Sequence, residues 1–192
     1  MNIILASGSP RRKSLLESLG LKFTVYRPDV NEEYIPREEP SEFCMRLAGL
    51  KANAGADVFP DDVIIAADTI VVVDGEILGK PHGRADAERM LRLLSGREHE
   101  VITGLAVIRR EGLNVADVHT LVKFRAMSDA DISAYLNTPE PYDKAGAYAV
   151  QGLGALFIEG INGDFYNVVG LPLCTLGRML QPHINLLPNR PA

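Results

Sequence analysis

The run from Val63 to Val73 constrains the fold more than any other segment of the chain. Its sequence, VIIAADTIVVV, is apolar and rich in β-branched residues, with Asp68 and Thr69 in the middle. Such a run predicts a buried strand, because β-branched residues favour strands and both faces must be covered. The Asp74-Gly75 pair that follows predicts a tight turn into a second, short strand at residues 76–78, so the two strands form a hairpin.

The rest of the chain alternates between strand and helix patterns. This predicts one mixed α/β domain over residues 1–192, with a twisted sheet, flanking helices and two lobes around a central cleft. Further strands are expected at residues 2–6, 23–26, 101–109 and 115–124, with short strands in the glycine-rich stretch 144–170. Helices are expected at residues 13–19, 41–56, 84–94, 128–137 and 171–187, with a turn at 7–12 and a frayed tail at 187–192.

Two details of the helices can also be predicted. Ser41 is expected to cap the helix that follows Pro40, and Phe43, Leu47, Leu50 and Ala54 are expected to share its apolar face. In the helix over 128–137, a serine followed three residues later by an aspartate predicts a capping box.

Composition excludes several classes of protein. Of 192 residues, 46% are hydrophobic and 23% are charged, and the 17 glycines, 12 prolines and two cysteines do not fit a collagen-like, disordered or disulfide-rich chain. No apolar run reaches the roughly 18 residues of a membrane helix. The first residues place the apolar stretch before the basic ones, the reverse of a secretory signal. We therefore expect a cytoplasmic globular protein with no membrane partner, and the net charge of -5 argues against binding a nucleic-acid polymer.

The cysteines and histidines do not indicate a soft-metal site. Cys44 and Cys174 each lie at helical spacing among apolar residues, so we expect both to be buried core residues rather than a disulfide. The four histidines are scattered along the chain and have no cysteine pair beside them. This spacing does not match a zinc site.

Asp68 departs most clearly from the pattern of a structural strand. An ionised carboxylate in an apolar strand is costly to bury unless it pairs with a cation or binds a metal. Asp68 is therefore a candidate functional group at a cleft. The alternative is an aspartate that ends the strand and caps a loop.

The segment Ser7 to Arg12, with the sequence SGSPRR, lies directly after the first strand and before the first helix. Backbone N–H groups at such a helix start favour anions, and two arginines add donors that suit phosphate. The Gly-Lys-Ser/Thr ending of a Walker A loop is absent. The alternative is an ordinary capped helix with surface arginines.

Four more polar residues lie at positions that allow a role in a site. Glu32 lies in an acidic loop, Lys51 in a predicted helix, Lys80 after the hairpin, and Gln151 at a turn in the glycine-rich stretch. Each of the three charged residues could equally be a solvated surface charge. Gln151 could read a base edge or simply satisfy the turn.

Taken together, seven segments resemble the Maf family of nucleoside triphosphate pyrophosphatases. They are LASGSPRR (residues 5–12), PDVNEE (28–33), RLAGLKA (46–52), AADTIVVVDGEILGKP (66–81), LSGREHEVITG (94–104), DKAGAYAVQG (143–152) and INGDFYNVVGLP (161–172). They follow one another in the family's order and span nearly the whole chain. The resemblance implies a fold similar to that of inosine triphosphate pyrophosphatases. It also implies hydrolysis of a nucleoside triphosphate to the monophosphate and pyrophosphate, in nucleotide-pool housekeeping, by a protein that often forms homodimers.

The resemblance also implies roles for individual residues. Asp68 matches the family's proposed proton acceptor, and the other matching polar site residues are Glu32, Lys51 and Lys80. Ser9, Arg11 and Arg12 match the phosphate-contacting loop. In such a site Glu32 and Asp68 would hold Mg²⁺ or Mn²⁺, which bind through carboxylates and phosphate oxygens.

Three positions mark the substrate subgroups of the family. Arg12, Thr69 and Gln151 resemble the subgroup that acts on dTTP and UTP. The branch similar to 7-methyl-GTP pyrophosphatases tends to have an aromatic residue after the loop proline and Gln after the catalytic Asp. This chain has Arg11 and Thr69 there. The alternatives are the same chemistry on another base, a modified pyrimidine nucleotide as substrate, or a nucleotide-binding regulator of septum formation without catalysis.

Overall fold

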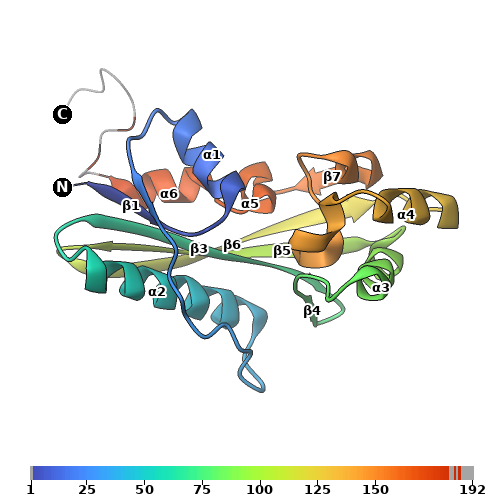
Figure 1. The fold of residues 1–192 in the computed structure, drawn as a ribbon, viewed down its shortest axis with the longest axis horizontal. Coiled ribbons are helices and arrows are strands. Elements are labelled where there is room, and N and C mark those ends of the chain that lie inside the picture. Colours follow the sequence, from blue (N-terminus) through green and yellow to red (C-terminus); the bar gives the residue numbers. More distant parts are fainter. Residues whose placement is uncertain (1, 182–183, 185, 187–192) are drawn as a thin grey trace. The chain divides into compact units, whose positions relative to one another are not determined.

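We describe residues 2–181, 184 and 186 of a computed structural model of the chain (Figure 1). The strands are β1 (Ile3–Ala6), β2 (Thr24–Tyr26), β3 (Val63–Val73), β4 (Glu76–Leu78), β5 (Glu98–Arg109), β6 (Gly112–Phe124) and β7 (Ile158–Asn162). The helices are α1 (Pro10–Ser18), α2 (Pro40–Val58), α3 (Arg84–Leu94), α4 (Asp129–Leu136), α5 (Phe165–Val169) and α6 (Leu173–Leu180). Three short 3₁₀ turns cover Glu140–Asp143, Ala145–Ala147 and Leu153–Phe157.

The strands form one mixed, seven-stranded sheet in the order β2-β1-β3-β5-β6-β7, with β4 paired to β3. Strand β1 pairs in parallel with β2 and β3, whereas β4 pairs with β3, and β7 with β6, in antiparallel fashion. The predicted mixed α/β fold with flanking helices is therefore confirmed.

The chain divides into two compact units. Unit 1 comprises Met1–Asp68, Thr103–Val118 and Gly170–Ala192, and unit 2 comprises Thr69–Ile102 and His119–Val169. Strands β3, β5 and β6 each contribute one part to unit 1 and the other part to unit 2. The boundary in β3 lies between Asp68 and Thr69, so Asp68 belongs to unit 1 and Thr69 to unit 2.

In unit 1, α2 covers one face of the sheet, and α1 and α6 cover the other (Figure 1). The core beneath α2 uses small and β-branched side chains, including Ala48 and Ala52 against Ile64 and Ala106. The predicted apolar face of α2 is wrong at one position: Leu50 is 38% exposed, whereas its neighbour Lys51 is only 8% exposed. The helix is rotated so that a lysine, rather than a leucine, faces the strands.

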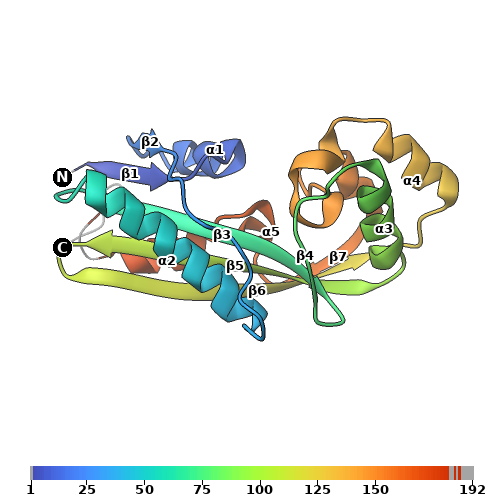
Figure 2. The ribbon, with the colours of Figure 1, turned by 60° about the horizontal axis from the view of Figure 1, so that its bottom comes forward.

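In unit 2, α3 and α4 pack side by side (Figure 2). Their core contains Leu91, Leu94 and Ile132 together with four aromatic residues. The four aromatic residues are Phe124, Tyr135, Tyr148 and Phe157. The rings of Phe124 and Tyr148 meet edge to face at 4.8 Å, a favoured aromatic geometry.

Several predicted elements are confirmed. The β3–β4 hairpin turns at Asp74 and Gly75, whose φ angles of 51° and 80° suit a tight hairpin turn. Helix α3 has the predicted bounds, and α4 begins with the predicted Ser128–Asp131 capping box.

Two helix starts differ from prediction. The segment predicted as a turn already contains the first residues of α1, because Pro10 suits the first helical position and Ser9 caps the helix. Helix α2 begins at Pro40 with Glu39 as its N-cap, so Ser41 does not cap it. Glu42 reaches back to the Glu39 backbone at 3.4 Å.

Three further expectations are wrong in part. The stretch 144–170 contains a single strand, together with 3₁₀ turns and the helix α5. Helix α6 is shorter than predicted and ends at Leu180, while residues 182–183, 185 and the tail 187–192 lie outside the described residues. Cys44 is buried as expected, but Cys174 is exposed, and both are free thiols.

His99 is a buried histidine in the core of unit 2. Its Nε2 lies 2.8 Å from the Tyr148 hydroxyl, and its Nδ1 has no hydrogen-bond partner among the described residues. Burial lowers the pKa of His99 to about 4. The folded protein therefore keeps His99 neutral at pH values where an unfolded chain, with a histidine pKa of about 6.5, takes up a proton.

This difference predicts that the protein loses stability as the pH falls from 6.5 towards 4. Between pH 7 and pH 5 the loss attributable to His99 should be about 2 kcal/mol in the free energy of unfolding. Denaturant unfolding of the wild type and of His99→Gln at both pH values measures it. The variant should be less stable at pH 7, but its free energy of unfolding should change less between pH 7 and pH 5. Equal pH dependence in both proteins would contradict the assignment.

Candidate active site

Asp68 lies at the centre of β3, the strand that sequence analysis singled out. Asp68 and Thr69 are the two residues of β3 that are not fully buried. The Asp68 side chain is 14% exposed, and its Oδ1 lies 2.6 Å from Lys51 Nζ. A carboxylate this deeply placed needs a cation nearby, and Lys51 supplies it.

Lys51 projects from the strand-facing side of α2 and joins two carboxylates. Its Nζ lies 2.7 Å from Glu32 Oε1 as well as 2.6 Å from Asp68 Oδ1. Glu32 is 57% exposed and lies in the loop between β2 and α2. The aliphatic stem of the lysine can pack against the strands while its ammonium reaches the two acids. Unit 1 therefore assembles one ammonium and two carboxylates, which we call the Lys51 cluster (Glu32, Lys51 and Asp68).

Arg12 lies in the first turn of α1 and is buried. Its Nε donates to the Gly170 carbonyl at 2.7 Å, and its Nη1 donates to the Ala67 carbonyl at 2.7 Å and to Ser7 Oγ at 3.2 Å. Burial lowers the pKa of Arg12 while the nearby Asp68 opposes that shift, and an arginine remains protonated at neutral pH. Arg12 thus holds the backbone immediately before Asp68.

The loop before α1 brings serine hydroxyls and backbone N–H groups together. Ser9 Oγ accepts from the Arg12 N–H at 3.5 Å, and Ser7 Oγ accepts from the Ser9 N–H at 3.2 Å. Arg11 is half-buried in the same helical turn. The sequence placed Ser7 in the candidate anion-binding segment but indicated no role for its side chain. Its place in the same loop as Ser9 was the available signal.

The remaining three candidates belong to unit 2. Lys80 is exposed after β4, Thr69 is half-buried in β3, and Gln151 is exposed in a turn before the 3₁₀ turn Leu153–Phe157. The Gly146 N–H donates to the Gly79 carbonyl at 3.1 Å, which ties the segment before Lys80 to the segment that leads to Gln151. The structure thus gathers Asp68, Lys51, Glu32 and Arg12 within unit 1.

Comparisons with known proteins identify the family of this chain. A family model described as "Maf-like protein" matches residues 2–183. This chain belongs to the Maf family. The family resemblance predicted from the sequence is therefore confirmed.

Curated relatives of this Maf protein share about half of its residues. A protein of Clostridioides difficile (strain 630) is 47% identical over 97% of both chains. One of Symbiobacterium thermophilum is 50% identical over 93% of this chain and 92% of its own. One of Geobacter sulfurreducens is 55% identical over 90% of this chain and 91% of its own. All three are named dTTP/UTP pyrophosphatase.

A solved structure also resembles this Maf chain. It is described as the Ham1 protein of Staphylococcus aureus and aligns with a TM-score of 0.57 over 96% of this chain and 100% of its own. The sequences are only 15% identical, so this likeness shows the fold alone.

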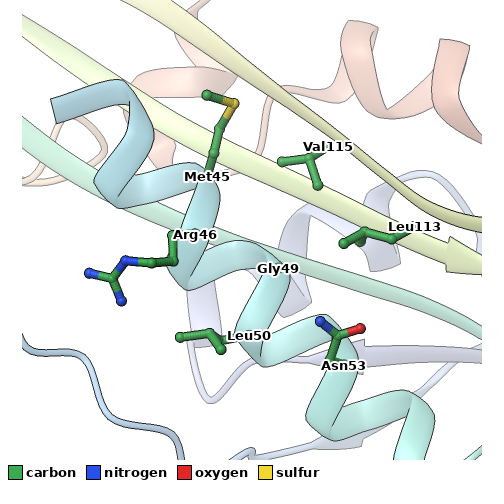
Figure 3. Close-up of a pocket in the computed structure, with 7 residues that line it drawn as sticks. All are labelled: Met45, Arg46, Gly49, Leu50, Asn53, Leu113 and Val115. Atoms are coloured by element: carbon green, nitrogen blue, oxygen red, sulfur yellow. The ribbon is translucent and has the colours of Figure 1, made fainter. Parts of the chain in front are cut away.

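An apolar hollow on unit 1 of the Maf protein is separate from the candidate site residues. It is lined by residues of α2 and β6, namely Met45, Arg46, Gly49, Leu50, Asn53, Leu113 and Val115 (Figure 3). No predicted site residue is among the residues that line it. We therefore place the candidate chemistry at the Lys51 cluster.

The arrangement of the acidic residues of the Maf protein bears on metal binding. Within residues 2–181, 184 and 186, no three His, Cys, Asp or Glu side chains come together as a ready-made metal site. Glu32 and Asp68 do converge on one cation, the Lys51 ammonium. No helix in the described part of the chain is long and apolar enough to cross a membrane.

Proposed function

We propose that this Maf protein hydrolyses dTTP and UTP to the nucleoside monophosphate and pyrophosphate. The observation that carries the proposal is the Lys51 cluster, in which a nearly buried carboxylate on β3 is paired with a lysine that also contacts Glu32. The names of the relatives support the substrate class. The proposed reaction breaks the phosphoanhydride linkage between the α- and β-phosphates.

In this proposal Asp68 accepts the proton of the attacking water. Lys51 orients the carboxylate through Oδ1 and compensates charge where a triphosphate adds about four negative charges to an acidic protein. Arg12, which the family resemblance implies contacts the phosphates, is also proposed to support Asp68, because its guanidinium donates to the carbonyl of the neighbouring Ala67. Proton transfer by a well-placed carboxylate contributes roughly 10²- to 10⁴-fold to a rate.

Binding of the triphosphate is assigned to groups that can donate hydrogen bonds or positive charge. Ser9 and Arg11 lie at the start of α1, where the helix dipole favours anions. Lys80 is a further proposed counter-charge, as the family resemblance implies. Cationic groups of this kind stabilise the charge on the departing pyrophosphate.

A divalent cation, Mg²⁺ or Mn²⁺, is proposed as the cofactor. The donor set fits, because Glu32 and Asp68 are carboxylates that already face one positive charge, and Mg²⁺ is typically held by one or two carboxylates and phosphate oxygens. When bound, such an ion neutralises phosphate charge and lowers the pKa of bound water.

Base selection is proposed to depend on Gln151 and Thr69. Thymine and uracil both present an N3–H between two carbonyl oxygens, and the Gln151 amide offers both an acceptor and donors for that edge. Thr69 is proposed to contribute to the surface that contacts the base. Cytosine lacks the N3–H, so the same amide edge matches it less well.

The proposed activity predicts a definite response to nucleotides and to metal removal. Purified protein with Mg²⁺ or Mn²⁺ should release pyrophosphate from dTTP and UTP faster than from other nucleoside triphosphates. Excess EDTA should reduce that rate at least about 100-fold, since metal ions contribute several kcal/mol to such steps. Re-addition of the metal should restore it.

The outcomes of this assay separate the alternatives. A preference for 7-methyl-GTP would keep the enzyme class and overturn the reading of Arg12, Thr69 and Gln151. Binding of nucleotides without any pyrophosphate release would favour a regulator without catalysis. Full activity in EDTA would contradict the proposed metal.

Location, cellular role and oligomeric state stay predictions. We propose that the protein acts in the cytoplasm, in nucleotide-pool housekeeping, and that it forms a homodimer. Light scattering on purified protein tests the dimer.

A further inference from the structure

Glu140 in unit 2 lies beside the segment that follows Gln151. Its Oε1 accepts from the Tyr135 hydroxyl at 2.8 Å and from the Gly154 N–H at 2.9 Å. Its Oε2 accepts from the Leu153 N–H at 2.9 Å. One carboxylate therefore binds two successive backbone amides, two and three residues after Gln151.

The backbone at Gly152 and Gly154 lies so close to its neighbours that neither position has space for a side chain. A Cβ on Gly152 would lie 2.1 Å from Glu140 Oε2, so a side chain at this position would displace the acid. A Cβ on Gly154 would lie 2.7 Å from the Ala149 carbonyl oxygen, because the segment folds back on itself around Gln151. Glu140 thus closes a compact loop whose exposed tip includes Gln151.

A second anchor holds the chain before Gln151. The Tyr148 ring is buried against Phe124, and its hydroxyl lies 2.8 Å from His99 Nε2. The backbone is therefore held three residues before Gln151 and two residues after it. Gln151 is therefore an exposed residue of a loop that is held on both sides.

All three groups bound by the Glu140 carboxylate are donors, so a carboxylate suits the place better than an amide. Glutamine has nearly the same shape, but its NH₂ group would face an N–H or O–H donor and lose at least one contact. The hydrogen bonds from Gly154, Tyr135 and Leu153 outweigh the opposing effect of burial and lower the pKa of Glu140, so the acceptor form persists at neutral pH.

We propose that Glu140 is a positioning residue for base discrimination, which fixes the backbone after Gln151 so that the Gln151 amide meets the pyrimidine edge in one orientation. The inference rests on the proposed function. It adds a residue that acts through Gln151 and not on the phosphates. Loss of the clamp should therefore impair the choice between bases far more than the hydrolysis step.

The test compares dTTP with dCTP in the wild type, Glu140→Gln, Gln151→Ala and the double variant. Glu140→Gln should raise KM for dTTP about tenfold, change kcat less than threefold, and reduce the dTTP-over-dCTP ratio of kcat/KM about tenfold, the size expected from one well-placed polar contact. In the double variant, Glu140→Gln should cause no further loss of that ratio, because the residues act as one unit.

Two further variants control for general effects. Glu159→Gln removes an exposed carboxylate of the same unit, which pairs with Lys123 at 3.0 Å, and should leave the ratio unchanged. Tyr135→Phe removes one donor to the carboxylate and should shift the ratio in the same direction as Glu140→Gln, by a smaller factor. If Glu140→Gln does not fold, Tyr135→Phe becomes the test of the inference. A folded Tyr135→Phe protein with the wild-type dTTP-over-dCTP ratio of kcat/KM then overturns it.

Other results also overturn the inference. One is an unchanged dTTP-over-dCTP ratio in folded Glu140→Gln, including an equal loss of kcat/KM for both nucleotides. The other is an unchanged ratio in Gln151→Ala. Absence of pyrophosphate release from dTTP and UTP by the wild type would instead refute the proposed function. The two failures are therefore distinguishable.

Discussion

Replacing Asp68 with asparagine is expected to reduce kcat/KM for dTTP and UTP by a factor of about 10³ or more. The asparagine amide has nearly the shape of the carboxylate but cannot accept the proton of the attacking water. It also removes the ionic partner that lies 2.6 Å from Lys51 Nζ. Steady-state kinetics of pyrophosphate release, with both substrates and saturating metal, measures the loss.

Asp57→Asn is the matched control, because Asp57 is an exposed aspartate near the end of α2. It should keep the wild-type kcat/KM. Circular dichroism and thermal unfolding must show that Asp68→Asn remains folded, since Lys51 keeps only Glu32 as a partner from the Lys51 cluster. A folded Asp68→Asn protein with more than a tenth of wild-type activity would remove Asp68 from the role of proton acceptor.

Gly104→Ala is expected to destabilise the protein by about 3 kcal/mol, at the upper end of typical overpacking effects. Gly104 lies on β5 directly against α2 of unit 1. A Cβ there would lie 2.3 Å from both the carbonyl carbon and oxygen of Cys44 and 2.6 Å from the Met45 nitrogen. These are backbone atoms of a helix, so they cannot rotate away as a side chain could. The helix must shift as a whole, and Lys51 shifts with it.

Gly49→Ala is the control for this substitution. Gly49 is buried in α2, but its added Cβ would meet only the Leu113 side chain, at an ordinary distance of 3.8 Å. Alanine is the better helix former, so this variant should be neutral or more stable by about 0.5–1 kcal/mol. Urea unfolding of both variants measures the difference. Equal stability of Gly104→Ala and the wild type would contradict the close contact between α2 and β5.

Much of the fold could be predicted because it depends on local patterns. The apolar run of β3, the Asp74-Gly75 turn and the capping box of α4 each specify an element within a few residues. The orientation of α2 could not be predicted in this way. Leu50 and Lys51 are neighbours, and hydrophobicity alone favours burying the leucine, whereas the structure buries the lysine because Asp68 lies beneath it.

The glycine-rich stretch shows a second limit of local patterns. Short strands were expected there, but Glu140 binds the N–H groups of Leu153 and Gly154, which a strand would use for its ladder. A side chain more than ten residues away thus decides the local structure. Similarly, Arg12 is held by the carbonyl of Gly170, which no sequence spacing relates to it.

Sequence analysis named the three residues of the Lys51 cluster, but it could not predict the contacts among them. Asp68 is prominent as an acid in an apolar strand, and the family resemblance implied roles for Lys51 and Glu32. The pairing of Lys51 with both acids depends on how α2 packs against β3, which is a tertiary property. The roles of these residues in catalysis stay predictions until the variants are measured.

The most direct test of the proposed function identifies the products formed from dTTP by the wild-type protein. Phosphorus NMR of the reaction with Mg²⁺ should show dTMP and pyrophosphate in equal amounts, with no dTDP or orthophosphate during the initial phase. In H₂¹⁸O a single labelled oxygen should appear in one of the two products, because one water is consumed. Formation of dTDP and orthophosphate, or no turnover of dTTP and UTP at all, would contradict hydrolysis between the α- and β-phosphates.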